Sequence, residues 1–260
     1  MNKAATEHKV GTHACKVLSA KPLNQRTFEI ELQSLEGVPL FYRAGQYLQL
    51  ELDVNNDEQS HSLSYTIASR FNPEQPSCLK LIIQIISEFS GKVIERLIEF
   101  SHNQKSVNIT LAMGKAYLQT DLDLLHVFVA AGSGISKIKS ITEEVVQRKP
   151  DTNIHIYWSN RSVDDFFLLN EFHSWAVQYQ NLNFTPILES AESNWSGRSG
   201  MIYQVIQEDG LDLSNAKTYL CGSPQMVYGT IDKLKSLGLQ EENCYSDVFE
   251  FAPREQKIAI

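Results

Sequence analysis

One stretch of the chain decides the fold: Val127-Phe128-Val129-Ala130-Ala131-Gly132-Ser133-Gly134-Ile135-Ser136. Its first five residues are apolar, which is typical of a strand buried on both faces of a parallel sheet. The Gly-Ser-Gly turn then leads into residues whose apolar positions recur at helical spacing. Small residues let a nucleotide approach the backbone, and the N–H groups and dipole of a helix start favour phosphate. The stretch predicts a strand–turn–helix unit that either only connects two elements or also binds a phosphate.

The residues after this stretch repeat the rhythm of strand and helix. Further apolar strands are predicted at Ile154–Trp158 and Tyr219–Leu220, each followed by a helical stretch. Such alternation is typical of a parallel sheet with helices on both faces. We therefore predict a five-stranded parallel-sheet nucleotide-binding domain over residues 119–260.

Two of these strands end in residues suited to a ligand. Arg161 follows the first, at the carboxyl edge where open α/β sheets bind ligands, and its guanidinium suits a ribose or phosphate. A solvent-facing loop arginine is the alternative. Cys221-Gly222-Ser223-Pro224 follows the second strand as another small-residue turn, with Pro at a helix start. For Cys221 the alternative is a buried, inert thiol.

The first part of the chain has a different pattern. Segments such as Phe28–Leu32 alternate apolar with polar residues, as half-buried strands do, and polar turns separate them. One helix is predicted at about Gly91–Glu99. Strands at this spacing predict a six-stranded antiparallel barrel over residues 1–118. The predicted strands are Cys15–Ser19, Thr27–Leu32, Tyr47–Leu52, Leu63–Ala68, Leu79–Ile85 and Ser106–Leu111.

Composition excludes several classes of function. The net charge of −8 disfavours a nucleic-acid partner, which needs a basic surface. No apolar run approaches the roughly 18 residues of a membrane helix, and the first residues lack the apolar core of a secretory signal. The 4 cysteines form no CxxC pair and the 7 histidines show no ligand spacing. We expect a cytoplasmic protein without a metal site or membrane association.

Taken in order, the motifs resemble the ferredoxin–NADP reductase superfamily, and within it the bacterial NAD(P)H–flavin oxidoreductases. The resemblance extends from about Cys15 to Phe251. The motifs that carry it are Ala44-Gly45-Gln46-Tyr47, Ser64-Tyr65-Thr66-Ile67-Ala68-Ser69, Gly132-Ser133-Gly134-Ile135-Ser136, Tyr219-Leu220-Cys221-Gly222-Ser223-Pro224-Gln225-Met226-Val227 and Asp247-Val248-Phe249-Glu250-Phe251.

The resemblance implies two binding sites. A flavin would bind the barrel, with Tyr65 packed on the isoalloxazine ring and Thr66 beside flavin N5 as the main catalytic aid. A nicotinamide dinucleotide would bind the second domain, with Arg161 on its adenosine ribose or phosphate and Cys221, also a catalytic candidate, beside the nicotinamide. The other implied contacts are Tyr47, Ser64, Met113, Gly114 and Phe249 for the flavin, and Gly132, Ser133, Gly134, Ile135, Ser136, Gly222 and Met226 for the dinucleotide.

Two departures from the FAD-retaining relatives concern flavin binding. Leu63 stands where those relatives have an Arg that pairs with the flavin phosphate, and the Ser or Thr they have near the position of Ile94 is missing. Each lost charged hydrogen bond is worth roughly 1.5–3 kcal/mol. We therefore expect FMN, riboflavin or FAD to be a dissociable substrate that is recognised by its ring, although Lys92 is a cation that would compensate.

The implied function is hydride transfer from NADH or NADPH to this flavin. One alternative is an FAD-bound reductase that passes electrons to a separate flavodoxin, oxygenase component or other protein. Another is a non-enzymatic nucleotide- or flavin-binding protein on the same fold. Asp164 and Asp165 follow Arg161 and would oppose a 2′-phosphate, which favours NADH. Besides these small molecules, a flavin-consuming or electron-accepting protein is the expected partner.

Overall fold

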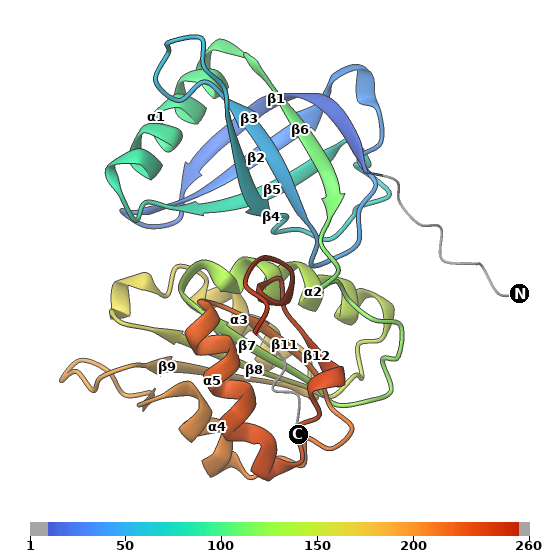
Figure 1. Ribbon diagram of the computed structural model, residues 1–260, viewed down its shortest axis with the longest axis vertical. Coiled ribbons are helices and arrows are strands. Elements are labelled where there is room, and N and C mark those ends of the chain that lie inside the picture. The colour runs from blue at the N-terminus through green and yellow to red at the C-terminus, as the bar shows by residue number, and fades with distance from the viewer. Residues whose placement is uncertain (1–9, 255–260) are drawn as a thin grey trace, which may run out of the picture. The chain divides into compact units, whose positions relative to one another are not determined.

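The computed structural model in Figure 1 describes residues 10–254. These residues form two compact units. The first unit runs to Leu118 and also includes Lys139–Glu144, and the second contains Gln119–Ile138 and continues from Val145. Each unit has a hydrophobic core of its own. The functional roles assigned to residues 1–118 and 119–260 stay a prediction.

The first unit contains an antiparallel sheet that curls into the predicted barrel. Its order is β4-β3-β6-β1-β2-β5, and its edges meet where Ile67, just after β4, forms an antiparallel bridge with Leu81 of β5. The fold prediction is therefore confirmed for this unit. The strands are β1 (Gly11–Pro22), β2 (Thr27–Ser34), β3 (Tyr47–Leu52), β4 (His61–Thr66), β5 (Cys78–Gln84) and β6 (Ser106–Met113).

The alternation of residue types explains the barrel strands, and capping explains its helix. In β3 the buried positions are Leu48, Leu50 and Leu52, and the residues between them are partly exposed. The helix α1 (Glu88–Asn103) is longer than the predicted nine-residue segment because a capping box starts it at Ser87 and a left-handed Gln104 ends it. A short 3₁₀ helix, η1 (Leu35–Gly37), precedes β3.

The second unit contains a parallel sheet in the order β10-β9-β8-β7-β11-β12. It has six strands rather than the predicted five. The edge strands β10 (Arg198–Ser199) and β12 (Cys244–Tyr245) are each 2 residues long, too short to leave a periodic pattern in the sequence. The longer strands are β7 (His126–Ala131), β8 (Ile154–Asn160), β9 (Leu182–Leu188) and β11 (Lys217–Cys221). As predicted from its apolar run, β7 is buried in the middle of the sheet.

Helices alternate with these strands, as the sequence predicts for a nucleotide-binding sheet. Side chains of α4 and α5 share a core with β7 and β11, so these two helices cover one face. The helices are α2 (Ile135–Arg148), α3 (Leu169–Gln178), α4 (Ile202–Asp209), α5 (Pro224–Leu234) and α6 (Val248–Phe251), with 3₁₀ helices η2 (Gly132–Gly134), η3 (Val163–Asp165), η4 (Lys235–Leu237) and η5 (Glu241–Asn243). Within residues 10–254, none of the helices combines the length and apolar character that crossing a membrane requires.

Candidate functional site

The predicted flavin residues of the barrel meet at one end of three neighbouring strands. Tyr47, the first residue of β3, is in register with Thr66 of β4 on one side and with Met113 of β6 on the other. Paired residues on adjacent strands have Cα atoms about 5 Å apart. The structure therefore brings Tyr47, Thr66 and Met113 together, with Gly114 directly after β6 and Ser64 two residues before Thr66.

Gln46 organises this end of the barrel, a role that the sequence analysis missed. Its buried side chain accepts a hydrogen bond from the Arg43 backbone N–H (2.8 Å) and donates to the carbonyls of Ala112 (2.9 Å) and Gly114 (3.3 Å). Its own carbonyl accepts from the backbone N–H of Ile67 (3.0 Å). Through its side chain and its backbone carbonyl, Gln46 thus joins the ends of β3, β4 and β6, which carry the predicted flavin contacts.

The side chains of β4 point alternately toward the barrel core and toward the exposed face, and this decides which of them a ligand can contact. Tyr65 is half-buried and packs against the barrel core together with Leu63, whereas Ser64 is exposed. Burial raises the pKa of Tyr65 to about 12, so its phenol stays protonated at neutral pH. A ligand can reach only the exposed part of the Tyr65 ring, and ring stacking on a flavin stays a prediction.

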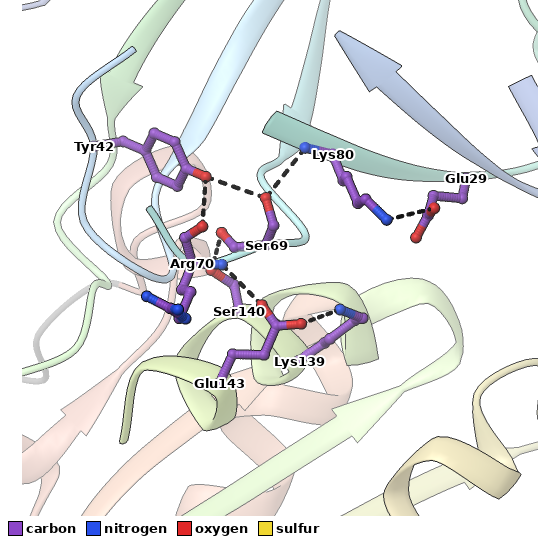
Figure 2. Close-up of polar contacts among 8 residues, drawn as sticks. All are labelled: Glu29, Tyr42, Ser69, Arg70, Lys80, Lys139, Ser140 and Glu143. Atoms are coloured by element: carbon purple, nitrogen blue, oxygen red, sulfur yellow. Dashed lines mark hydrogen bonds and ion pairs between the residues drawn. The ribbon is translucent and has the colours of Figure 1, made fainter. Parts of the chain in front are cut away.

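The segment that follows Thr66 is held by a group of polar contacts, which Figure 2 shows. The Tyr42 hydroxyl lies 3.1 Å from Ser69 Oγ and donates to the Arg70 carbonyl (3.0 Å). Ser140 Oγ donates to the Ser69 carbonyl (2.8 Å), and Glu143 Oε2 accepts from the Arg70 N–H (2.9 Å). Burial raises the pKa of Tyr42, which keeps the phenol protonated as a donor. These bonds fix Ser69 and Arg70, a few residues beyond Thr66, which is the last residue of β4.

The start of α1 uses the protein's own side chains as hydrogen-bond partners. Ser87 Oγ accepts from the Ser90 N–H (3.2 Å), and Ser90 Oγ accepts from the N–H groups of Ile86 and Ser87 (both 2.9 Å). Lys92, the cation expected to compensate for the missing Arg, forms an ion pair with Glu88 at 3.3 Å. The N–H groups of Ile86, Ser87 and Ser90 are therefore engaged within the protein rather than offered to a pyrophosphate. The pair of Lys92 and Glu88 is exposed, so it offsets part of the lysine charge.

In the second unit, the two predicted coenzyme turns touch each other. Gly132 has a left-handed φ of +55°, and its carbonyl accepts a hydrogen bond from Trp158 Nε1 (2.9 Å). Gly134 lies so close to the end of β11 that an added Cβ would be 2.4 Å from the Cys221 carbonyl oxygen. Only glycine fits there. The turn of residues Gly132–Ser136 is therefore packed against the Cys221–Gly222 turn.

Cys221 is a neutral thiol in this setting. It ends β11 and is buried, and burial raises its pKa to about 12. A thiol with this pKa does not supply the thiolate that nucleophilic catalysis needs at neutral pH. Beyond it, Ser223 Oγ caps α5 by accepting from the Met226 N–H (3.3 Å), and Pro224 occupies the first helical position as predicted. The arrangement suits binding beside Cys221 rather than covalent attack by it.

An ion pair between a buried lysine and a partly buried aspartate joins α2 to the start of α6, and no local sequence pattern predicts it. Lys137 Nζ lies 2.8 Å from Asp247 Oδ2 and 2.9 Å from Oδ1, and the lysine side chain is only 4% exposed. Both charges act on the buried Cys221 thiol, where Lys137 lowers the pKa and Asp247 raises it. A cation and an anion therefore lie close to Cys221 and offset each other.

Arg161 lies at the carboxyl edge of the sheet, as its position after β8 predicts. Its side chain is 86% exposed, and Nε lies 3.2 Å from Oε2 of Glu189, which follows β9. Glu189 lies 28 residues from Arg161 in the chain, so no local pattern in the sequence pairs them. A carboxylate next to the predicted ribose- or phosphate-binding arginine changes which coenzymes the arginine can attract, because it offsets the positive charge.

The remaining predicted contacts are placed as follows. Phe249, predicted to contact the flavin, lies on α6 of the second unit with its ring 5.8 Å from the Tyr228 ring. Met226 lies on α5 beside Gly222, where an added Cβ would meet its Cε at 2.2 Å. Over the part of the chain that the structure describes, no three His, Cys, Asp or Glu side chains are grouped so that they could hold a metal ion.

The barrel and the parallel sheet with its glycine turn define a two-unit, NAD-binding oxidoreductase. Residues 128–231 match the oxidoreductase NAD-binding domain family. An NAD(P)H-flavin reductase of Vibrio harveyi is 25% identical over 92% of this chain and 99% of its own length. A CDP-6-deoxy-L-threo-D-glycero-4-hexulose-3-dehydrase reductase of Yersinia pestis is 27% identical over 92% of this chain and 69% of its own length.

The solved structure of an Amycolatopsis cytochrome P450 reductase is 20% identical with a TM-score of 0.77, over 92% of this chain and 70% of that one. In sequence and fold the chain resembles the ferredoxin–NADP reductase superfamily.

Proposed function

We propose that the protein is an NAD(P)H–flavin oxidoreductase that moves a hydride from nicotinamide C4 to N5 of a dissociable flavin. The observation that carries the proposal is the contrast within the barrel unit. Tyr47, Thr66 and Met113 are in register at one end of the sheet. The start of α1, where FAD-retaining relatives hold phosphate, is engaged by its own serines. This contrast fits a ring site without a phosphate site, and the Vibrio flavin reductase is a relative over its whole length.

In this proposal the protein positions the two substrates, and the substrates carry the redox chemistry. The hydride leaves C4 with its electron pair, so the nicotinamide is oxidised and the flavin reduced, and a solvent proton completes the reduced flavin. Transfer requires the two reacting atoms to lie about 3–3.5 Å apart. Thr66 would donate a hydrogen bond at N5 through its hydroxyl or its N–H, and Cys221 would border the nicotinamide as a neutral thiol.

The dissociable flavin gives a direct test. After dialysis the purified protein is expected to lack a flavin absorption spectrum, and NADH oxidation should be strongly stimulated by free riboflavin, FMN or FAD. Because the phosphates find few partners, we expect KM values for the three flavins within about tenfold of each other, a span that corresponds to less than one charged hydrogen bond. Riboflavin, which has no phosphate, is the internal control. Stoichiometric FAD that survives dialysis would contradict the proposal.

A second candidate function is an FAD-bound reductase that hands electrons to a separate protein. Reductase names among the relatives favour it, such as the reductase component of the Pseudomonas putida naphthalene 1,2-dioxygenase system, which is 26% identical over 81% of this chain and 61% of its own length. NADH oxidation that appears only with a protein acceptor would support this candidate. No oxidation with any flavin or protein acceptor would support a non-enzymatic binding role instead. The expected cytoplasmic location stays a prediction.

We infer that NADH is preferred over NADPH. Glu189 holds Arg161 in an ion pair, and both are exposed at the edge of the sheet where the adenosine ribose would bind. A carboxylate accepts a hydrogen bond from a ribose 2′-hydroxyl but repels a 2′-phosphate. Asp164 and Asp165 on η3 add negative charge close by in the chain.

This inference predicts a change of coenzyme preference in Glu189→Gln. We expect the ratio of kcat/KM for NADPH to that for NADH to rise about tenfold, since the freed Arg161 can form a charge-assisted bond with the 2′-phosphate. Glu192→Gln, an exposed acidic residue of the same loop, is the matched control and should leave the ratio unchanged. Equal ratios in the wild type and Glu189→Gln would show that Glu189 does not select the coenzyme.

A further inference from the structure

We propose that the C-terminal segment Asp247–Arg254 is a wall of the coenzyme site that ion pairs hold at both ends, with Lys137 and Arg254 as positioning residues. The inference rests on the proposed function, because it takes the Cys221–Gly222 turn as the place that receives the nicotinamide. The segment follows β12 and contains α6.

The segment depends on outside contacts for its position. The helix α6 has only 4 residues and no side-chain cap at its start, far fewer residues than an isolated helix needs to be stable. Of its side chains, Val248 is buried and anchors it, whereas Phe251 is 67% exposed. Contacts at the two ends of the segment must therefore fix its course.

The inner end is held by the ion pair of the buried Lys137 and the partly buried Asp247. Lys137 lies in the first turn of α2, immediately after the Gly132–Ser136 turn, and its Nζ contacts both carboxylate oxygens of Asp247 at 2.8 and 2.9 Å. Because Lys137 is buried and Asp247 is only 23% exposed, salt screens this pair less than a fully exposed one. This contact ties the start of the segment to the predicted phosphate-binding turn.

The outer end is held by Arg254. Its Nη1 lies 2.9 Å from both carboxylate oxygens of Asp232 on α5, and its Nη2 lies 2.6 Å from Glu241 Oε2. The guanidinium lies over the Tyr228 ring at 4.9 Å. The Tyr228 hydroxyl in turn donates to the Ala252 carbonyl (2.9 Å) and accepts from the Arg254 N–H (3.1 Å). These contacts form an exposed clamp that salt can screen.

Between its two ends, the segment packs on α5, the helix that begins directly after the Cys221 turn. Phe249 packs against Tyr228, and Phe249, Tyr228 and Met226 all pack at the edge of the same hydrophobic core. Met226 in turn packs against Gly222, where an added Cβ would lie 2.2 Å from Met226 Cε. If the segment is already ordered in the free protein, coenzyme binding does not have to order it and avoids that entropic cost. Loosening either end should therefore weaken coenzyme binding more than it slows the chemical step.

The first test compares Arg254→Gln with Arg198→Gln. Arg198 is the matched control because it forms a similar exposed clamp, with Glu208 and Asp209, away from the C-terminal segment. We expect Arg254→Gln to raise the NADH dissociation constant and KM about threefold to fivefold, to leave kcat within about twofold, and to speed amide hydrogen exchange across residues 247–252. Arg198→Gln should change none of these. Moderate salt should speed amide hydrogen exchange across residues 247–252 in the wild type and add little in Arg254→Gln.

The second test addresses the inner end. Lys137→Met should raise the NADH dissociation constant by about tenfold or more, and Lys137→Arg, which keeps the charge, should restore part of the affinity. Unchanged exchange in Arg254→Gln would overturn the clamp, and faster exchange with unchanged NADH affinity would overturn the wall. If the wild type binds NADH but reduces no flavin, the proposed function fails while these two readouts still decide the wall.

Discussion

Replacement of Gly134 by Ala is expected to lower NADH-dependent flavin reduction at least about tenfold and to destabilise the second unit. The added Cβ would lie 2.4 Å from the carbonyl oxygen of Cys221 and 2.9 Å from its carbonyl carbon. Backbone atoms cannot rotate away as a side chain can, so either the start of α2 or the end of β11 must move. Overpacking of this kind costs about 1–3 kcal/mol. Both turns are predicted to hold the coenzyme, so their displacement should raise the KM for NADH.

The control for this substitution is Gly229→Ala on α5. Gly229 is exposed, and an added Cβ there would have no neighbour within 4 Å. Within a helix, Ala is favoured over Gly by about 0.5–1 kcal/mol, so this variant should be as stable as the wild type or slightly more stable. Thermal unfolding and the KM for NADH are measured for both variants. Wild-type stability and KM in Gly134→Ala would contradict the close packing of the two turns.

Local sequence patterns predicted the elements that bury long or strictly alternating apolar runs. The run Val127–Ala131 gave the central strand β7 because a strand between two others must be apolar on both faces. The alternation in Tyr47–Leu52 gave β3 with its full bounds. The edge strands β10 and β12 escaped prediction because two residues carry no period. The full extent of α1 also escaped, since its ends are set by the caps at Ser87 and Gln104 rather than by apolar residues.

Part of the candidate site was also predictable from local motifs, whereas the rest depends on contacts between residues that are distant in the chain. Residues within one motif, such as Gly132–Ser136, could be proposed from composition and from the resemblance. The pairs that tune the site could not, because topology alone brings their members together. Lys137 and Asp247 are 110 residues apart, and Arg161 and Glu189 are 28 apart. The ion pair of Lys92 was predictable but was not predicted, because its partner Glu88 lies only one helical turn away in the sequence.

Replacement of Thr66 by Val is expected to slow flavin reduction about tenfold to a hundredfold at saturating NADH, with little change in the KM for NADH. The size follows from the loss of one donor that stabilises charge where it develops in the transition state. The fold should survive because Thr66 ends β4 in register with Tyr47 and valine suits a strand. Single-turnover stopped-flow measurement of flavin absorbance separates this chemical step from product release.

Two further variants decide which part of Thr66 acts. Thr66→Ser keeps the hydroxyl and loses only the methyl group, so it should retain most of the rate. The control is Ser62→Ala. Ser62 is exposed on the same face of β4 as Thr66 and is in register with Glu51, so this variant should behave as the wild type. A slow Thr66→Ser would assign the effect to packing of the methyl group. A wild-type rate in Thr66→Val would leave only the backbone N–H of Thr66 to serve N5, because the substitution removes the hydroxyl and preserves the backbone.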